Sequence, residues 1–249
     1  MRLQQFFEQN PRIAVAYSGG VDSSYLLYAA KTAGCDVHAY LIKAEFQPQF
    51  EVEDAINVAK SLDIPLTIET ISVLDDKNVA ENPPERCYYC KTKILEKLLK
   101  LALADGYTVL CDGSNADDDE SDRPGMKAVK EQGVLSPLRI CKLSKRKIRS
   151  LSKKAGLPTH DKPAYACLAT RIPTGTAITK TLLEKIERSE GSLFDMGFSD
   201  FRVRIIPPDI AQIQMPARQW KKAASRHKKI TKELSSDFST VVLDMKERK

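Results

Sequence analysis

The sequence predicts an α/β fold: a parallel sheet with helices on both faces, followed by a smaller C-terminal α+β domain. Two observations support this prediction. In the first half of the chain, short apolar runs alternate with segments whose apolar residues recur at helical spacing, which is typical of βαβ units. In the second half, a proline-containing loop is followed by one helical segment and then by two strand-like runs.

Four strands and four helices are expected in the first half. The strand-like runs are residues 12–17, 36–42, 65–71 and 107–113. The helical segments are residues 21–30, 51–62, 91–104 and 143–156. The last of these is basic and amphipathic, and it is closed by Gly156 and Pro158, which are residue types that end helices. Because strands and helices alternate, the strands are expected to run parallel.

A domain boundary is expected near residue 158, which divides the chain into residues 1–158 and 159–249. The second domain should contain a loop, a helix, two strands and a basic helical tail, in this order: residues 160–176, 179–191, 201–206, 209–215 and the chain after Arg218. Pro163 and Pro173 lie in the predicted loop, where their fixed backbone angle is tolerated.

Composition narrows the class of protein. The 249 residues carry a net charge of +6, which suits phosphate-bearing ligands without requiring a nucleic acid. No apolar run approaches the roughly 20 residues of a membrane span, and the N-terminal MRLQQFFEQNPR lacks the apolar core of a secretory signal. Six cysteines are too few for a disulfide scaffold, so a close cysteine pair indicates a metal or redox site. We therefore expect a cytoplasmic protein with no membrane partner.

The segment SGGVDS, residues 18–23, is the most informative motif because it joins the first strand to the first helix. Its glycines let the backbone turn tightly and approach an anion closely. The helix start supplies unpaired N–H groups, and Ser18 and Ser23 add hydroxyl donors. The motif therefore predicts a cradle for pyrophosphate. The alternative is a plain turn in which Asp22 or Ser23 caps the helix.

Two other nucleotide-binding patterns, GxxxxGK[ST] and GxGxxG, are absent from the chain. Their absence argues against ordinary γ-phosphate transfer and against dinucleotide binding. A second polar turn, residues 112–114, follows the fourth predicted strand. Ligands of parallel sheets sit beyond the carboxyl ends of the strands, so this turn is expected beside residues 18–23.

Three cysteines form the second informative pattern. Cys87 and Cys90 have CxxC spacing directly before a helix, and Cys167 lies in the loop of the second domain. Two thiolates at this spacing can bind one metal centre, and a helix start favours their negative charge. A zinc site needs four ligands, but the chain has no second CxxC and its histidines are not at ligand spacing. Three thiolates on a cubane iron–sulfur cluster would leave one iron open to an exogenous sulfide.

Other interpretations of these cysteines stay open. The CxxC pair could be a redox or persulfide site, zinc could be completed by His160 or a carboxylate, or the thiols could be inert. The three remaining cysteines lie on or next to apolar strands and are interpreted as core residues: Cys35, Cys111 and Cys141.

Several motifs in order resemble the LarE family of PP-loop sulfur transferases, which act in nickel-pincer nucleotide biosynthesis. They are SGGVDS (18–23), RCYYCK (86–91), DGSNADDDESDRPG (112–125), VLSPL (134–138), KPAYACLATRIPTGT (162–176) and GFSDFRVR (197–204). The resemblance spans about residues 10–215. It implies a PP-loop ATP pyrophosphatase fold, similar to the adenine nucleotide alpha hydrolases, for the first domain and a substrate and sulfur-transfer role for the second.

The resemblance also implies that ATP is cleaved between its α- and β-phosphates, so that a substrate is adenylated and pyrophosphate is released. ATP phosphate is assigned to the residues of the Gly-rich loop: Ser18, Gly19, Gly20, Asp22 and Ser23. Mg²⁺ is expected on the pyrophosphate. In the acidic stretch 117–122, only Asp122 is taken as a site residue, and most of the stretch is interpreted as a solvated loop.

One branch of the LarE family sacrifices the sulfur of a single cysteine and lacks the CxxC pair. The other branch has three cysteines and is thought to use a [4Fe–4S] cluster with an extra sulfide. Cys87, Cys90 and Cys167 match the second branch. The resemblance therefore implies that these residues hold a [4Fe–4S] cluster and that a sulfide donor renews the sulfur.

The family's substrate resembles a pyridinium dicarboxylate mononucleotide, whose carboxylate becomes a thiocarboxylate. Arg202 and Arg204 match an RVR motif that resembles a site for the substrate phosphate, and strand alternation puts both on one face. Thr170 and Arg171 are expected to add to this site. Glu190 falls where the family carries a site carboxylate. The alternatives are solvated strand arginines and a glutamate on a helix surface.

One departure from the family is Gln214, where the family often has glutamate, so the role of that carboxylate is absent or moved. LarE relatives form hexamers, and a homo-oligomer is expected. The basic tail is interpreted as a solvated helix face, with RNA or an oligomer partner as the alternative. Competing functions are a [4Fe–4S]-dependent tRNA thiolase of the PP-loop class, an amidating synthetase, and a nucleotide- or metal-sensing module without turnover. The RPG, LATRIP and RVR motifs favour the LarE family over the tRNA thiolase, so a nucleic-acid partner is not expected.

Overall fold

The computed structural model describes residues 2–118 and 124–248, and the chain forms two compact units. Unit 1 consists of Met1–Val73 and Glu85–Lys162, and unit 2 consists of Leu74–Pro84 and Pro163–Lys249. The short segment Leu74–Pro84 therefore belongs with the C-terminal part of the chain. The sequence-based domain boundary near residue 158 stays a prediction.

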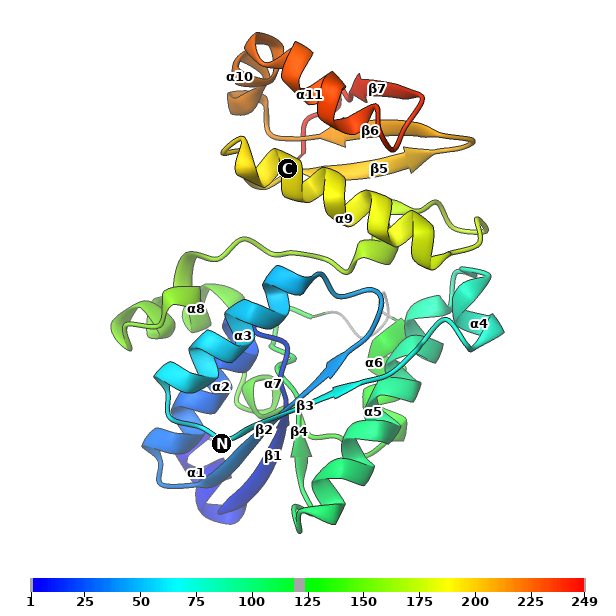
Figure 1. The fold of residues 1–249 in the computed structure, drawn as a ribbon. Coiled ribbons are helices and arrows are strands. Elements are labelled where there is room, and N and C mark those ends of the chain that lie inside the picture. Colours follow the sequence, from blue (N-terminus) through cyan, green and yellow to red (C-terminus); the bar gives the residue numbers. More distant parts are fainter. Residues whose placement is uncertain (1, 119–123, 249) are drawn as a thin grey trace. The chain divides into compact units, whose positions relative to one another are not determined.

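Unit 1 contains a four-stranded parallel sheet in the order β3-β2-β1-β4 (Figure 1). Its strands are β1 (Arg12–Ala16), β2 (Asp36–Lys43), β3 (Leu66–Thr70) and β4 (Leu110–Cys111). The predicted α/β class is thereby confirmed. β4 is much shorter than the predicted run 107–113: it pairs with β1 at Ala14 and Val15, and Cys111 forms an isolated parallel bridge with Leu135.

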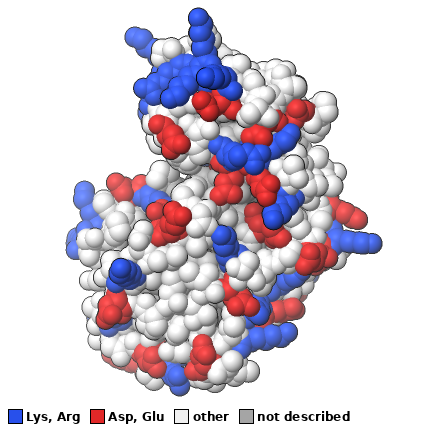
Figure 2. Space-filling model, viewed as in Figure 1, with Lys and Arg blue, Asp and Glu red and all other residues white. Residues whose placement is uncertain are grey.

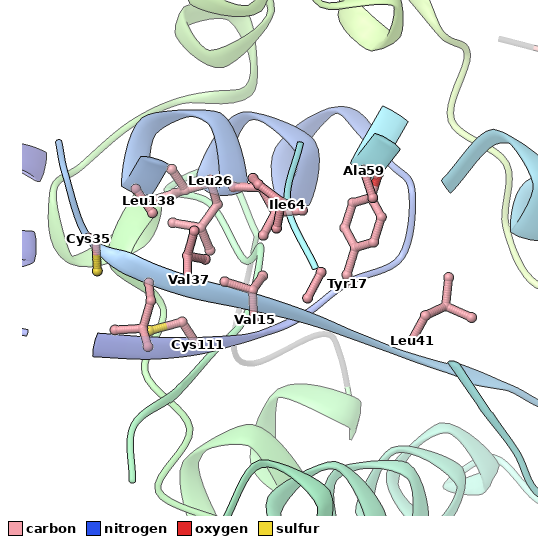
Figure 3. Packing of buried hydrophobic residues seen from close by; sticks show 14 of the residues in the cluster. Val15, Tyr17, Leu26, Cys35, Val37, Leu41, Ala59, Ile64, Cys111 and Leu138 are labelled. Atoms are coloured by element: carbon pink, nitrogen blue, oxygen red, sulfur yellow. The ribbon is translucent and has the colours of Figure 1, made fainter. Parts of the chain in front are cut away.

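Helices cover both faces of this sheet. One face packs against α1 (Leu3–Gln9), α2 (Val21–Thr32), α3 (Gln49–Ser61), α7 (Pro137–Ile140) and α8 (Lys145–Lys154). The other packs against α5 (Arg86–Ala104) and α6 (Pro124–Glu131). Consecutive residues of β1 alternate between two cores: Val15 packs with Leu26 and Leu138 (Figure 3), and Ala14 lies in the core that contains Leu95. Among the described helices, none is both long and apolar enough to span a membrane.

Unit 2 contains a smaller sheet in the order β5-β6-β7. β5 (Arg202–Ile206) and β6 (Ile210–Gln214) are antiparallel, and β7 (Thr240–Leu243) runs parallel to β6. Its helical segments are α4 (Lys77–Ala80), η2 (Leu168–Arg171), α9 (Lys180–Asp195), η3 (Ala217–Gln219), α10 (Trp220–Ser225) and α11 (His227–Leu234). The prediction of a helical tail is wrong at its C-terminal end, where the β-branched sequence TVVL forms β7.

Candidate functional site

The loop between β1 and α2 has a backbone that only glycine fits. Gly19 has φ +71°, and a Cβ there would lie 2.8 Å from the Cβ of Ala55 in α3. Both the left-handed backbone and the close approach therefore exclude a larger residue. Gly20 is the N-cap of α2 and carries no capping side chain, so the first N–H groups of the helix stay available to an anion.

A second loop, which follows β4, lies against the start of α2. A Cβ on Gly113 would be 2.9 Å from the backbone nitrogen of Ser23, so the two loops touch. Asp112 fixes the shape of this second loop from a buried position. Its carboxylate accepts hydrogen bonds from Ser114 N (3.1 Å), Ser114 Oγ (2.6 Å) and Ser136 Oγ (2.7 Å). The prediction that the turns after β1 and β4 are neighbours is confirmed.

Side chains of the first loop add donors and one ion pair. The hydroxyls of Ser18 and Ser23 lie 3.1 Å apart, and Ser23 also donates to Gly20 O (3.3 Å). Asp22 Oδ2 accepts a hydrogen bond from Lys145 Nζ, and Asp22 Oδ1 is buried with no hydrogen-bond partner among the described residues. The loop thus combines backbone and hydroxyl donors with one ammonium group and one unused carboxylate oxygen.

The first turn of α8 brings Lys145 to this loop. Ser144 caps the helix by accepting a hydrogen bond from Lys147 N (3.3 Å), and Asp117 Oδ2 accepts one from Lys145 N (2.8 Å). The negative charge of Asp117 is therefore stabilised by the positive, N-terminal end of the helix dipole of α8. The first part of the acidic stretch is structural in this sense, whereas the predicted site residue Asp122 lies outside the described residues.

The CxxC pair lies in the first turns of α5. Cys87 is exposed, Cys90 is half-buried, and residues three apart share one face of a helix. Arg86 Nη2 donates to Cys87 Sγ (3.4 Å), and Tyr88 Oη donates to Glu131 Oε2 (2.7 Å), which fastens the start of α5 to α6. Within the described part of the chain, no group of three or more His, Cys, Asp or Glu is arranged to hold a metal ion.

Three other cysteines of unit 1 are poor candidates for sulfur chemistry. Burial raises the pKa of Cys35 to about 11 and raises the pKa of Cys111 further. Burial also raises the pKa of Cys141, which packs against the core beside α7. Because the thiolate is the reactive form, these thiols are expected to be inert at neutral pH.

Cys167 lies in unit 2, at the N-cap of η2. Its carbonyl oxygen accepts hydrogen bonds from Thr170 N (3.0 Å), Thr170 Oγ1 (2.9 Å) and Arg171 Nη1 (3.2 Å). Arg171 Nη1 also donates to Ala166 O (2.6 Å). The backbone on either side of the sulfur-bearing residue is thus held by one buried guanidinium group.

Arg171 forms a fully buried ion pair with Glu190 of α9, and each residue is 1% exposed. Nε and Nη2 donate to the two carboxylate oxygens, each at 2.9 Å. Burial alone would lower the pKa of Arg171, but the hydrogen bonds and charge of Glu190 outweigh it and raise that pKa. The assignment of Arg171 and Thr170 to substrate phosphate stays a prediction, as does a site role for Glu190.

Arg202 and Arg204 project from the same face of β5, as strand alternation predicts. Arg202 Nε is buried and has no hydrogen-bond partner among the described residues. Burial, together with the charges of Arg248, Arg171 and Arg204, lowers the pKa of Arg202 to about 10. Crowded, partly desolvated guanidinium groups of this kind attract an anion.

Gln214 takes part in this arginine group through its side-chain amide. Arg204 Nε donates to Gln214 Oε1 (2.7 Å), and Gln214 Nε2 donates to Asp244 Oδ2 (2.7 Å). Arg204 Nη1 also donates to Thr170 O (3.0 Å). A carboxylate is therefore connected to Arg204 even though residue 214 is glutamine. It belongs to Asp244, and the amide of Gln214 bridges it to the guanidinium group.

Sequence reasoning missed Lys145 and the contacts of Asp112. Lys145 lies in a run of basic residues that gives no sign of a contact 123 positions earlier in the chain. Asp112 carries a usable signal, because it directly follows a strand of a parallel sheet, where functional side chains gather.

Comparison with known proteins gives one family match and three informative relatives. Residues 11–132 match the family described as tRNA methyl transferase HUP domain. The chain is 38% identical over 218 residues to an uncharacterised protein of Synechocystis sp., covering 87% of this chain and 81% of that protein. It is 30% identical over 237 residues to the pyridinium-3,5-bisthiocarboxylic acid mononucleotide synthase of Lactiplantibacillus plantarum, covering 94% and 86%. It is also 27% identical over 220 residues to a tRNA-specific 2-thiouridylase of Pseudothermotoga lettingae, covering 74% and 63%.

Proposed function

Because the chain belongs to the LarE family of PP-loop ATP-dependent sulfur transferases, we propose that it converts a carboxylate of a pyridinium dicarboxylate mononucleotide to a thiocarboxylate in nickel-pincer nucleotide biosynthesis. One observation carries this proposal. The chain combines a backbone anion cradle in unit 1 with an arginine site in unit 2, where Arg202 Nε has no hydrogen-bond partner among the described residues. Two anion sites suit a reaction in which both reactants, ATP and a mononucleotide, carry phosphate.

In the first step, a carboxylate oxygen of the substrate attacks the α-phosphorus of ATP, and the bond from that phosphorus to the bridging oxygen breaks. The products are an acyl adenylate and pyrophosphate. The N–H groups at the start of α2, with the hydroxyls of Ser18 and Ser23, would stabilise the departing pyrophosphate. Lys145 would neutralise part of its charge. The unused Oδ1 of Asp22 suits Mg²⁺, which prefers carboxylate oxygen and accompanies ATP.

The substrate phosphate is assigned to Arg202 and Arg204. A dianion placed against them would supply the countercharge that the crowded guanidinium groups lack, and it would offer acceptors to the buried Nε of Arg202. The hydrogen bonds from Arg204 to Gln214 and Thr170 hold the second guanidinium in a fixed orientation. The arginine site would thereby orient the mononucleotide before its carboxylate is activated.

For the sulfur source, Cys87 and Cys90 fit a [4Fe–4S] cluster, since thiolates are its usual ligands and these two lie on one face of α5. The family resemblance adds Cys167 as the third ligand. When bound, the cluster supplies sulfide for the second step. Attack of sulfide on the acyl carbon forms the C–S bond, breaks the C–O bond to AMP, and leaves a thiocarboxylate. Arg86 holds the sulfur of Cys87 in place through its hydrogen bond.

The proposal is tested by separating the two steps with cysteine variants. In anaerobically prepared protein, Cys87→Ala should retain pyrophosphate release that depends on the mononucleotide and should lose the thiocarboxylate product. Iron and sulfide contents should fall in the same variant. Cys141→Ala is the matched control, because that thiol packs against the core, and it should keep both activities. Full thiocarboxylate formation by Cys87→Ala would refute the assigned sulfur route.

A second candidate function is thiolation of tRNA. It is favoured by the similarity to tRNA-specific 2-thiouridylase and by the basic side chains that gather on α10 and α11 (Figure 2). Exposed basic residues of this face are Lys221, Arg226, Lys228, Lys229 and Lys232. If tRNA is the substrate, its affinity should fall steeply with salt, because each neutralised phosphate releases counterions. Absence of salt-dependent tRNA binding would exclude this candidate.

A further inference from the structure

The carboxylate of Glu190 is fully occupied within unit 2. Its Oε1 accepts hydrogen bonds from Arg171 Nε and Val203 N, each at 2.9 Å. Its Oε2 accepts hydrogen bonds from Arg171 Nη2 (2.9 Å) and from the hydroxyl of Tyr165. An ionised carboxylate offers about four acceptor positions, and these four donors account for them. A substrate would have to displace one of these donors to contact Glu190.

We propose that Glu190 and Arg171 are positioning residues that lock the Cys167 segment and the arginine strand β5 into one arrangement. The proposal rests on the proposed function, because it connects the residue assigned to sulfur chemistry with the residues assigned to substrate phosphate. In this proposal the pair acts through its neighbours and not by binding the substrate.

The connection to Cys167 runs through Arg171 and Tyr165. Arg171 Nη1 donates to the carbonyl oxygens of Ala166 and Cys167, and the Arg171 guanidinium lies 4.5 Å from the ring centroid of Tyr165. Both of these residues are tied in turn to Glu190. The ion pair therefore contacts the Cys167 segment on both sides of the cysteine, and a shift of Glu190 would move the backbone that carries the thiol.

The connection to the arginines runs through the backbone of β5. This strand lies at the edge of its sheet, so an N–H group on its outer side needs a partner other than a strand. Glu190 supplies that partner at Val203, the residue between Arg202 and Arg204. A second contact, from Arg204 Nη1 to Thr170 O (3.0 Å), links the same two segments directly.

Replacing Glu190 by glutamine tests this connection with little change in shape. The amide would set N–H groups against donors and would leave the buried guanidinium of Arg171 without a countercharge. In Glu190→Gln, we expect the rate of Cys167 alkylation by iodoacetamide to change by about tenfold and the affinity for nicotinic acid mononucleotide, used as a probe, to fall by a similar factor. Both quantities are measured on the full chain, the first by peptide mass spectrometry.

Two controls and one further test variant accompany Glu190→Gln. Alkylation of Cys87 and Cys90 in the same samples, prepared without iron so that the three thiols are not joined by a cluster, should be unchanged, because both lie in unit 1. Arg188 also lies on α9, and Arg188→Gln breaks its ion pair with Asp237. This substitution should alter neither readout. Tyr165→Phe removes the hydrogen bond to Glu190, keeps the ion pair, and should shift both readouts in the same direction by less. It therefore decides the proposal if Glu190→Gln does not fold.

Two results would overturn the proposal. If the substitution weakens mononucleotide binding and leaves Cys167 alkylation unchanged, Glu190 serves the phosphate side alone. If neither readout changes in a folded variant, the ion pair positions nothing. Failure of the proposed function is recognised separately, as an absence of mononucleotide binding by the unmodified protein. In that case, an unchanged rate of Cys167 alkylation in Glu190→Gln overturns the proposal. An altered rate supports the connection from Glu190 to the Cys167 segment.

Discussion

The two anion sites proposed for this molecule are built in opposite ways. In unit 1, the loop between β1 and α2 offers backbone N–H groups and hydroxyls, and it uses glycine where a side chain does not fit. In unit 2, the site consists of guanidinium groups on a strand, and burial together with neighbouring arginine charges lowers the pKa values of Arg202 and Arg204. The first site depends on shape, and the second depends on charge. Substitutions that change only one of these properties should therefore affect only one unit.

The largest effect is expected from Gly19→Ala. The new Cβ would lie 2.8 Å from the Cβ of Ala55, and the alanine would have to adopt a left-handed backbone conformation. The loop and the N–H groups at the start of α2 must therefore move. Pyrophosphate release should fall by about a hundredfold or more, as when a preorganised donor is removed from an active site.

Gly20→Ala is the matched control for this substitution. The nearest atom to a Cβ at that position is Ser18 Oγ, at 3.5 Å, and the backbone there is not left-handed. Its pyrophosphate release should lie much closer to that of the unmodified protein. Equal losses in the two variants would show that the loop is not sensitive to shape in the way described.

The next largest effect is expected from Arg202→Gln. Losing one charged hydrogen-bond donor should cost about 2 kcal/mol of binding, or roughly thirtyfold in the Kd for the mononucleotide. The melting temperature of the free protein should stay the same or rise, because a buried and crowded charge has been removed. Calorimetric titration and thermal unfolding measure the two quantities. A large drop in melting temperature would mean that Arg202 is structural.

Lys145→Gln sharpens the comparison from the side of unit 1. This lysine is the charged group beside the backbone cradle, through its contact with Asp22. Its loss should lower pyrophosphate release by about tenfold, which is less than the effect of distorting the loop. Lys147→Gln changes an exposed lysine on the same helix and should have little effect. If both variants are equally active, the cradle needs no charged side chain.

The smallest effect is a pH dependence of mononucleotide binding. The pKa of Arg202 is lowered to about 10, so the folded protein disfavours the charged form of this side chain. The charged side chain therefore costs folding free energy, and this cost decreases as the pH rises above about 10 and the side chain loses its proton. Binding of a phosphate needs the charged form. The affinity should therefore be constant between about pH 8, where the phosphate is already a dianion, and pH 9, and it should decline as the pH passes about 10, where an ordinary arginine would still be charged. Affinity that stays constant to pH 11 would contradict this description.

Much of unit 1 could be predicted from the sequence, because the central strands β1 and β2 of its parallel sheet are buried on both faces and are nearly continuous apolar runs. Gly19 could be found because a tight loop after a strand demands glycine. Arg202 and Arg204 could be found from their spacing along a strand.

The contacts that depend on packing could not be predicted. Arg171 and Glu190 are polar residues 19 positions apart, and their burial against each other follows from the docking of η2, α9 and β5. Similarly, nothing in the basic run around Lys145 indicates that its ammonium group reaches Asp22. The assignment of Leu74–Pro84 to unit 2 also depends on tertiary contacts, such as the hydrogen bond from Asn82 to Pro173 O (2.8 Å).

The most direct test of the central claim measures both products of one reaction. Anaerobically prepared protein is incubated with Mg²⁺, ATP, sulfide and the pyridinium dicarboxylate mononucleotide, and pyrophosphate and the mass of the mononucleotide are followed together. We expect pyrophosphate to form only when the mononucleotide is present, in step with replacement of a carboxylate oxygen by sulfur. Pyrophosphate without any thiolated mononucleotide, or sulfur incorporated into added tRNA instead, would contradict the claim.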